Sequence, residues 1–472
     1  MTLSLSVSFE GLLNIFSDCF TKSSFENFKT LITGWVLTPG RKTITRVIQS
    51  ADAVNKKHHS CFYNFFSRAK WNIDLLSKLV AKMIVKVFIP TGNPIVTAGD
   101  DTLYAKSGHK IPGTGMFRDP VLSTKNITVL RWGQNWVTLG IILKLPFFNE
   151  RYICLPIMAR YCSKKQPYST KEDIHQTRCQ LMVEMLCLFA SWFPEYKSIH
   201  VVDGAYANNT VVPDLPKNVE IVSRIRKDAA IFTSPPKPTG KRGAPRKKGD
   251  RLPTPEQIAN HPSIPFKEIE ATVYGETRIF MVKGIKALWY RVAKDRLLYI
   301  LIVRDPLGKY NDEFYFTTDF SLLPWDVLEL IAGRWSIEVT HRDSKQYLGI
   351  NDPQIRNPKS VKREIPFGFL IMSLIILWYA KYGYKSCYDI RPKAPWYNQK
   401  QTPSFLDMLA TLRRSLWASA FFDNSTSEVK MQKISGGFDP VFAPFNQNKE
   451  LDTDKKVLNP LKFIIQIASM AA

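Results

Sequence analysis

The strongest constraint on the fold is a succession of short apolar runs between residues 93 and 226. Three of them have the period-two pattern of strands that we expect to pair antiparallel: NPIVTAGDDTLYA (93–105), WVTLGIILKLPFF (136–148) and RYICLPIMARYC (151–162). An amphipathic stretch from about Lys171 to Phe193 predicts a helix. Two buried strands follow, SIHVV, which leads into Asp203, and VEIVSRI (219–225). This order predicts a mixed α/β sheet with flanking helices.

Residues 1–90 are expected to form a helical DNA-binding domain. Helical segments lie around FENFKTLITGWVL, over Thr43 to Ala53 and over Leu75 to Phe88. Between the last two, KKHHSCFYNFFSRAKW alternates basic and aromatic residues. A helix, a turn and a helix that carry these cations suit the reading of DNA ends. An ordinary helical bundle with a solvated basic face accounts for the same pattern.

Residues 227–318 interrupt the α/β pattern. The segment SPPKPTGKRGAPRKKGDR (234–251) is rich in Pro, Gly and basic residues and predicts an exposed loop. Its candidate DNA-binding residues are Lys241, Arg242, Arg246, Lys247 and Lys248. A solvated linker that touches phosphates without sequence preference accounts for the same composition. Five short strands are predicted after it, in IEATVYG, TRIFMVKGI, ALWYRVA, LLYILIVRD and EFYFTTD. We interpret the whole as a basic loop with an inserted β-rich subdomain.

Helix returns at 323–349, and the rest of the chain is predicted to be mostly helical. The expected domains are therefore 1–90, a core in two parts (91–226 and 319–390), the insertion at 227–318, and a C-terminal helical region, 391–472, that is a candidate for dimerisation. The apolar stretch Ile365 to Ala380 contains Pro366 and is short for a membrane span, so a buried helix is the better interpretation. We expect no membrane association.

The net charge indicates the class of binding partner, and the cysteine pattern indicates the cellular compartment. The 65 Lys and Arg against 41 Asp and Glu give a net charge of +24, which favours a polyanion such as nucleic acid. A basic enzyme that never meets nucleic acid has the same composition. The seven Cys form no CxxC pair and no zinc-finger spacing with the seven His. Scattered thiols, and an N-terminus without a secretory pattern, predict a cytoplasmic protein.

Three acids have the placement that metal-dependent cleavage of phosphodiester bonds requires. Asp101 follows the apolar strand PIVTAG, Asp203 ends the strand IHVV, and Glu338 lies inside the last long helix. Carboxylates are suitable ligands for hard cations, and two ions stabilise both the attacking and the leaving oxygen. Around Glu338, Arg334 and Lys345 fall on one helix face, at about 100° per residue. Each Asp alone also suits a turn or cap, and the helix suits a surface salt-bridge row.

With these motifs the chain resembles the DDE transposases of bacterial insertion sequences, in the group marked by Tyr-x2-Arg-x3-Glu-x6-Lys. IAGRWSIEVTHRDSK reproduces the Arg, Glu and Lys at that spacing, but Ile331 stands where the group has Tyr. GDDT (99–102) resembles the motif of the first acid and favours Asp101 over Asp100. Adjacent residues of a strand point to opposite faces, so only one of the two should face the metals. VVDGAYAN resembles the motif of the second acid, Asp203.

The resemblance implies a ribonuclease H-like core, a β-rich insertion and a cut-and-paste reaction. Two Mg²⁺ ions, or Mn²⁺ in their place, would be held by Asp101, Asp203 and Glu338. Arg334, Trp335 and Lys345 would contact DNA, and Trp335 would stack on an extruded base, although a core Trp suits the helix equally well. The partners implied are terminal inverted repeats and target DNA in a homodimeric complex. A non-catalytic DNA-binding descendant, or a nuclease of this fold that does not join DNA, are the alternatives.

Overall fold

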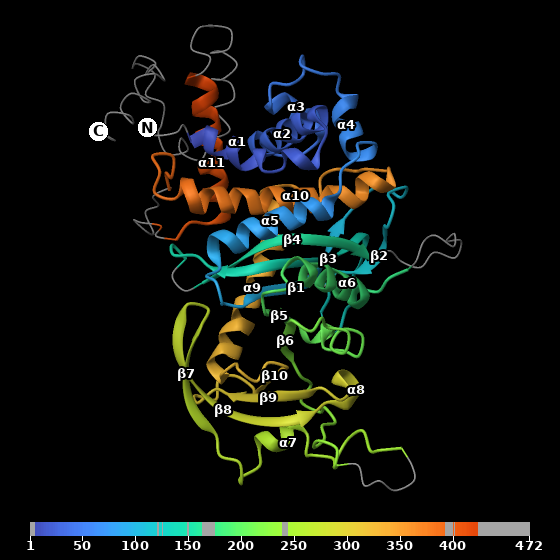
Figure 1. Cartoon of the computed structure of the whole chain (residues 1–472), viewed down its shortest axis with the longest axis vertical. Helices are drawn as coiled ribbons and strands as arrows, with labels where there is room; N and C mark the ends of the chain where they lie inside the picture. Colours follow the sequence, from blue (N-terminus) through green and yellow to red (C-terminus); the bar gives the residue numbers. More distant parts are fainter. Residues whose placement is uncertain are drawn as a thin grey trace. The chain divides into compact units, whose positions relative to one another are not determined.

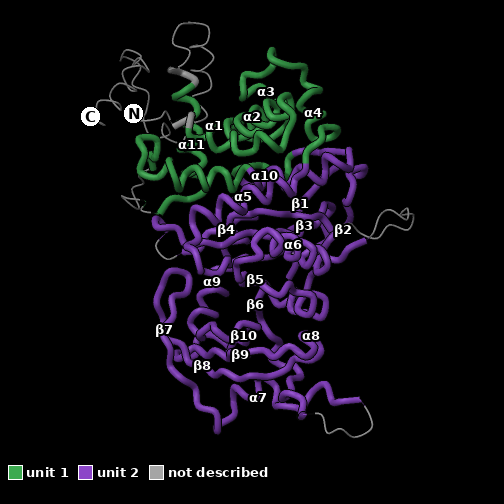
Figure 2. Tube along the Cα trace, in the orientation of Figure 1, with its two compact units in different colours: residues 1–71, 347–352, 371–472 green, residues 72–346, 353–370 purple. Residues whose placement is uncertain are grey.

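The computed structural model describes residues 5–119, 122–124, 126–148, 151–162, 175–237, 244–391, 400 and 402–422. Two compact units are present (Figure 2). Unit 1 comprises residues 1–71, 347–352 and 371–472, and unit 2 comprises residues 72–346 and 353–370. Most of the C-terminal region predicted to be helical, 423–472, lies outside the described residues.

Unit 1 is helical in its described part. Its elements are α1 (Leu5–Asn14), η1 (Ser17–Cys19), α2 (Lys22–Leu37), α3 (Ile44–Ser50), α4 (Ser60–Ser67), η3 (Tyr379–Gly383) and α11 (Phe405–Phe422). Two of these helices have an N-cap threonine whose side-chain oxygen accepts a backbone N–H, Thr21 in α2 and Thr43 in α3. α2 and α3 pack so closely that a Cβ on Gly34 would overlap the backbone oxygen of Val47. The predicted helical character of this region is confirmed, and its DNA-binding role stays a prediction.

Helix α5 (Ile73–Phe88) belongs to unit 2. Its buried face includes Leu76, Val80 and Ile84, and its first turn carries Asp74, which pairs with Arg160 at 2.6 Å. Arg160 lies on β4 (Tyr152–Cys162), so this ion pair joins the helix to the sheet. Unit 1 therefore ends at Trp71 along this part of the chain, and α5 packs with the α/β core.

The described part of unit 2 is built on a ten-stranded mixed sheet in the order β2-β3-β1-β5-β6-β10-β9-β8-β7, with β4 paired to β3 (Figure 1). The first four strands are β1 (Ile95–Ala105), β2 (Gly115–Arg118), β3 (Leu130–Lys144) and β4. β1, β3 and β4 pair antiparallel as predicted, whereas β5 (Ser198–Val202) and β6 (Val219–Arg224) continue the sheet in parallel. A large mixed sheet with helices fits the predicted ribonuclease H-like class. The short strand β2 was not predicted.

Two helices pack on opposite faces of the central strands. α6 (Arg178–Trp192) begins with a capping box of Thr177 and Gln180. Of the predicted start from about Lys171, residues 171–174 lie outside the described residues, and the prediction was wrong for 175–177, which are not helical. α9 (Pro324–Gln346) buries Val327 and Ile337 in one apolar cluster with Ala98 of β1 and Val201 of β5. The neighbouring position Gly99 lies instead against Met182 of α6. Alternate residues of β1 therefore face α9 and α6.

The strands predicted as an insertion extend the same sheet. β10 (Glu313–Thr317) pairs antiparallel with β6 and with β9 (Leu297–Arg304), and β8 (Glu276–Leu288) and β7 (Lys267–Val273) follow. The short helix α7 (Pro255–Ala259) precedes them. The prediction of a separate strand in ALWYRVA was wrong. β8 continues through this segment until Leu288 pairs with Phe232, and the chain then turns through α8 (Tyr290–Ala293).

Helix α10 (Pro358–Trp378) contains the apolar stretch noted in the sequence. Together with η3 it is long and apolar enough to be a candidate membrane span, with a mean hydropathy of 1.6 over its most apolar window. Within the protein, 83% of that window is buried. Such burial is what a core helix of this composition shows.

Candidate active site at the ends of strands β1 and β5

Two aspartates lie side by side where β1 and β5 run in parallel. The printed register pairs Ala98 with Val201 and Gly99 with Val202. The next residue of each strand is Asp100 and Asp203, respectively. Neighbours in register on parallel strands point to the same face of a sheet. Because Ala98 and Val201 both pack with α9, Asp100 and Asp203 are on the α9 face.

Asp100 lies against α9, and its surroundings oppose a negative charge. Its Oδ2 is 3.8 Å from Nδ1 of His341, a ring that is neutral because burial lowers its pKa to about 3. Burial, and then the charges of Asp101 and Glu338, raise the pKa of Asp100 to about 7. The backbone N–H of Asp101, at 2.8 Å, and the charge of Arg334 act in the opposite direction. A desolvated carboxylate beside other carboxylates is the electrostatic setting that a bound cation relieves.

Glu338 reaches this face from the middle of α9. Its Oε1 accepts a hydrogen bond from Nη2 of Arg334 at 2.8 Å, one helical turn earlier. Asp203 is exposed, and its Oδ1 accepts the N–H of Gly204 at 2.7 Å at the start of η2 (Gly204–Tyr206). Asp203 and Arg334 line one small cavity, together with Val202, Arg224, Tyr274, Ile331 and Trp335. The α9 face thus gathers Asp100, Asp203 and the Arg334–Glu338 pair.

Asp101 points the other way, toward α6. Its two carboxylate oxygens accept hydrogen bonds from Nη1 of Arg178 at 2.9 and 2.8 Å. The hydroxyl of Tyr206 donates to it at 2.9 Å, and Nδ2 of Asn135 donates at 3.0 Å. Sequence reasoning missed Arg178, Tyr206 and Asn135. Only the strand alternation signalled that one of the two aspartates would face away from Glu338.

The other signature residues of α9 have distinct surroundings. Nζ of Lys345 donates to Oγ1 of Thr102 at 2.7 Å and to the backbone oxygen of Leu103 at 3.0 Å. Burial lowers the pKa of Lys345 to about 8. Lys345 therefore ties α9 to β1, two residues beyond Asp100. Trp335 is 52% exposed, so it is not a core Trp.

The carboxylates suit a hard divalent cation in their chemistry, because all their donor atoms are oxygens. Among the residues that the structure describes, no three His, Cys, Asp or Glu side chains lie close enough together to hold a metal ion. Glu338 is hydrogen-bonded to Arg334, and Asp203 accepts the N–H of Gly204.

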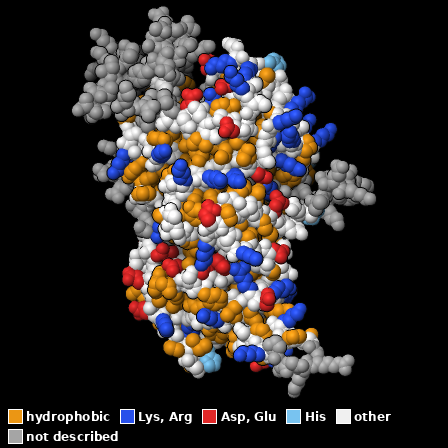
Figure 3. Space-filling view, viewed as in Figure 1, with side chains coloured by type: hydrophobic (Ala, Val, Ile, Leu, Met, Phe, Trp, Pro, Cys, Tyr) orange, Lys and Arg blue, Asp and Glu red, His pale blue; other side chains and the backbone are white. Residues whose placement is uncertain are grey.

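The basic loop is described only in part. Lys241 and Arg242 lie outside the described residues. Arg246, Lys247 and Lys248 line a cavity of about 550 Å³ together with Phe232 and Tyr290. Nζ of Lys248 lies 4.0 Å from the centroid of the Phe232 ring, and Arg246 pairs with Asp250 at 3.2 Å. Figure 3 shows Lys and Arg side chains on the surface that β7–β10 and the neighbouring loops form, with Asp and Glu among them.

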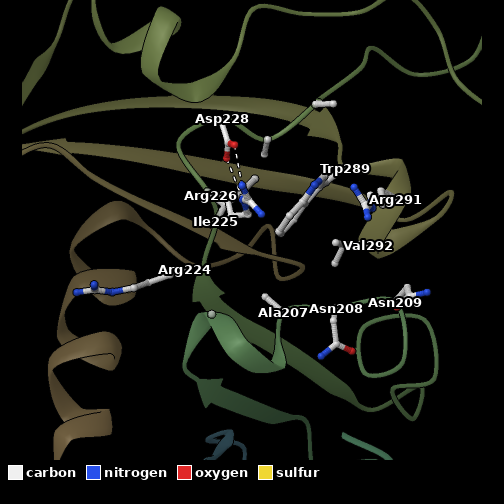
Figure 4. A pocket seen from close by; sticks show the side chains of 13 residues that line it. Ala207, Asn208, Asn209, Arg224, Ile225, Arg226, Asp228, Trp289, Arg291 and Val292 are labelled. Carbon is white, nitrogen blue, oxygen red and sulfur yellow. Dashed lines mark hydrogen bonds and ion pairs between the residues drawn. The ribbon is translucent and has the colours of Figure 1, made fainter. Parts of the chain in front are cut away.

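A larger cavity, of about 610 Å³, lies beside the residues that follow Asp203 (Figure 4). Gly204, Ala207 and Asn208 form one side, and Trp289 and Arg291 form another. Arg226 also lines it and is held by Asp228 at 2.7 Å. Arg224 lines this cavity and the smaller one near Asp203, and its side chain extends toward α9. Cationic and aromatic side chains thus line the cavity beside Gly204, and Arg224 is common to it and to the small cavity at Asp203.

Comparison with known proteins identifies the family. Residues 15–279 match the family model described as DDE superfamily endonuclease, which is more than half of the 472 residues. The match includes Asp100, Asp101 and Asp203 and ends before Glu338. No curated protein matches the chain. The chain belongs to the DDE superfamily endonuclease family, whose members are nucleases and transposases that act on DNA.

Proposed function

We propose that this protein is the transposase of a bacterial insertion sequence and moves it by a cut-and-paste reaction. Hydrolysis nicks one strand at each end of the element, and the freed 3′-OH attacks a second phosphodiester, either across the duplex to form a hairpin or in the target. The observation that carries the proposal is the convergence of Asp100, Asp203 and the Glu338 helix on one face of the sheet. Family membership supports DNA as the substrate.

We further propose Asp100, and not Asp101, as the first catalytic acid, with Asp203 and Glu338 as the others. Asp100 neighbours Asp203 in the parallel register and responds to the charge of Glu338. Asp101 is on the opposite face, and its oxygens are occupied by Arg178, Tyr206 and Asn135. Three hydrogen-bond donors of the protein already stabilise the negative charge of this carboxylate, so a bound cation would stabilise it little further.

In this proposal Asp100, Asp203 and Glu338 hold two Mg²⁺ ions, for which Mn²⁺ substitutes. When bound, the ions supply Lewis-acid activation of the attacking oxygen and stabilisation of the leaving oxygen. The chain's own residues do the rest. Arg334 has five N–H donors and uses Nη2 for its hydrogen bond to Glu338. Its other N–H groups are available to a phosphate in the small cavity that Arg334 lines with Asp203. Lys345 orients β1 through Thr102 and Leu103.

DNA binding is proposed for three surfaces. The net charge of +24 supports an extended contact with phosphates, and Arg246, Lys247 and Lys248 with the neighbouring Lys241 and Arg242 form the most basic segment. The exposed ring of Trp335 is available to stack on a base. The turn before α4 carries further cations of the helical N-terminal region. We propose a homodimer on paired terminal repeats, acting at the bacterial nucleoid.

The test uses the full-length protein and a supercoiled plasmid that carries its coding sequence with the natural flanking DNA. With Mn²⁺ or Mg²⁺, we expect nicks at the element ends and covalent joining of those ends to a second plasmid. Asp100→Ala, Asp203→Ala and Glu338→Ala should abolish both products and leave DNA binding nearly unchanged. Cleavage without joined product would indicate a nuclease, and binding without cleavage would indicate a DNA-binding protein; either result rejects the transposase.

A further inference from the structure

The turn between β7 and β8 has an unusual residue at its tip. Val273 pairs with Glu276, so Tyr274 and Gly275 form a two-residue hairpin turn. Both have positive φ, 57° for Tyr274 and 84° for Gly275. Such turns favour Asn, Asp or Gly at the first position, because a Cβ with a bulky substituent is strained there. A tyrosine at this position therefore costs folding stability.

Burial does not compensate this strain. The side chain of Tyr274 is 63% exposed, in a turn where a small polar residue would fit without penalty. Packing against the protein thus gives no reason for an aromatic residue here. Strained residues of this kind occur where a side chain is needed for contact with a ligand.

The surroundings of Tyr274 indicate the ligand. The hairpin lies along α9 (Figure 1), and Tyr274 lines the small cavity formed with Asp203, Arg224 and the α9 residues Ile331, Arg334 and Trp335. Arg224 pairs with Glu313 at 2.9 Å and Arg334 with Glu338 at 2.8 Å, which leaves further N–H donors on each guanidinium. Ile331 contributes no polar atom. A phenol, two guanidinium groups and an exposed indole that line one cavity suit contact with one phosphodiester and its attached base.

We propose that Tyr274 binds the DNA strand at the phosphate next to the cleaved bond. Its hydroxyl donates a hydrogen bond to a phosphate oxygen, and Arg224 and Arg334 neutralise the phosphate charge. The tip of the β7–β8 hairpin holds the DNA strand against Trp335. This inference rests on the proposed function of the Asp100, Asp203 and Glu338 site.

The experiment separates binding from structure by measuring cleavage and stability together. Tyr274→Asn relieves the strained backbone and removes the phenol, so the midpoint of thermal unfolding should rise by about 2 °C. Tyr274→Phe keeps the backbone and removes only the hydroxyl, so the midpoint should not change. Plasmid cleavage at subsaturating DNA should fall about tenfold in Tyr274→Phe, which loses a hydrogen bond to a charged group, and further in Tyr274→Asn.

Tyr310→Phe is the matched control. Tyr310 is also exposed, at 68%, and lies between β9 and β10 without lining this cavity; its variant should cleave as the wild type does. Wild-type cleavage by both Tyr274 variants, in a protein whose activity depends on Asp100, would overturn this inference and leave the proposed function intact. Failure of the wild type itself to cleave would instead reject the proposed function, and this inference with it.

Discussion

The two adjacent aspartates should respond in opposite ways when each is changed to asparagine. Asp100→Asn keeps the shape of the side chain and removes a charge that its surroundings oppose. The shift of its pKa from 3.8 to about 7 corresponds to roughly 4 kcal/mol at most. Because partial exposure and relaxation reduce that figure, we expect a gain of about 2 kcal/mol in the free energy of unfolding at pH 8 without metal.

The size of this stabilisation depends on pH. The folded-state pKa of Asp100 is above the unfolded value, so the unfolded state releases the proton first as pH rises. This carboxyl therefore lowers stability progressively between about pH 4 and pH 7, and fully above that window. The stabilisation by Asp100→Asn should be present at pH 8 and absent at pH 4.

Asp101→Asn should destabilise the protein instead. It removes a charged acceptor from Tyr206, which is buried, and from Asn135. It also removes the ion pair with Arg178, which counts for little because that side chain is 50% exposed. We expect a loss of about 2–3 kcal/mol at pH 8.

Urea unfolding in EDTA at pH 8 and pH 4, with plasmid cleavage in Mg²⁺ measured in parallel, tests both substitutions. Asp100→Asn should be more stable and inactive. Asp101→Asn should be less stable, with cleavage within about tenfold of the wild type at a temperature where it is folded. The opposite pattern, in which Asp101→Asn is stable and inactive while Asp100→Asn cleaves, would refute the reasoning.

Two further predictions concern residues around β1. Lys345 has a pKa of about 8, so its charged contacts with Thr102 and Leu103 weaken above that pH. The kcat/KM of cleavage should fall above about pH 8, whereas Lys345→Arg, which stays charged, should lack this decline; a decline shared by both would exclude Lys345 as its source. Glu364→Gln removes the negative charge that pairs at 2.9 Å with the fully buried ammonium of Lys106. We expect the free energy of unfolding, measured in urea, to fall by about 3–5 kcal/mol. Glu276→Gln, which removes the exposed ion pair with Arg278, should cause no measurable change, and equal losses in the two variants would contradict this prediction.

Local patterns were sufficient for much of the fold. Period-two runs predicted β1, β3 and β4, and the 3.6-residue period predicted α9, because each element buries one face along its own length. The helical character of residues 5–88 followed in the same way. β2 was missed because four residues carry too little pattern, and ALWYRVA was misassigned because Ala287 and Leu288 complete β8 before Trp289 turns the chain.

Local sequence patterns could not predict which elements pair or pack when they are far apart in the sequence. Nothing in the segment Glu313–Thr317 signals that β10 pairs with β6 and so joins the predicted insertion to the core sheet. The same limit applied to the first acid. The motif favoured Asp101, and alternation required that one aspartate face away from the metals. Our proposal of Asp100 in its place depends on which face of the sheet α9 covers. That is a property of packing between segments about 240 residues apart in sequence.

The most direct test of the central claim is the metal dependence of cleavage after a thiol replaces the first acid. Thiolate is a softer ligand than carboxylate and binds Mg²⁺ poorly, whereas Mn²⁺ tolerates it. We predict that Asp100→Cys fails to cleave the plasmid in Mg²⁺ and recovers cleavage in Mn²⁺, while Asp101→Cys shows no such difference between the two ions. Recovery by Mn²⁺ at position 101, with none at position 100, would contradict the account.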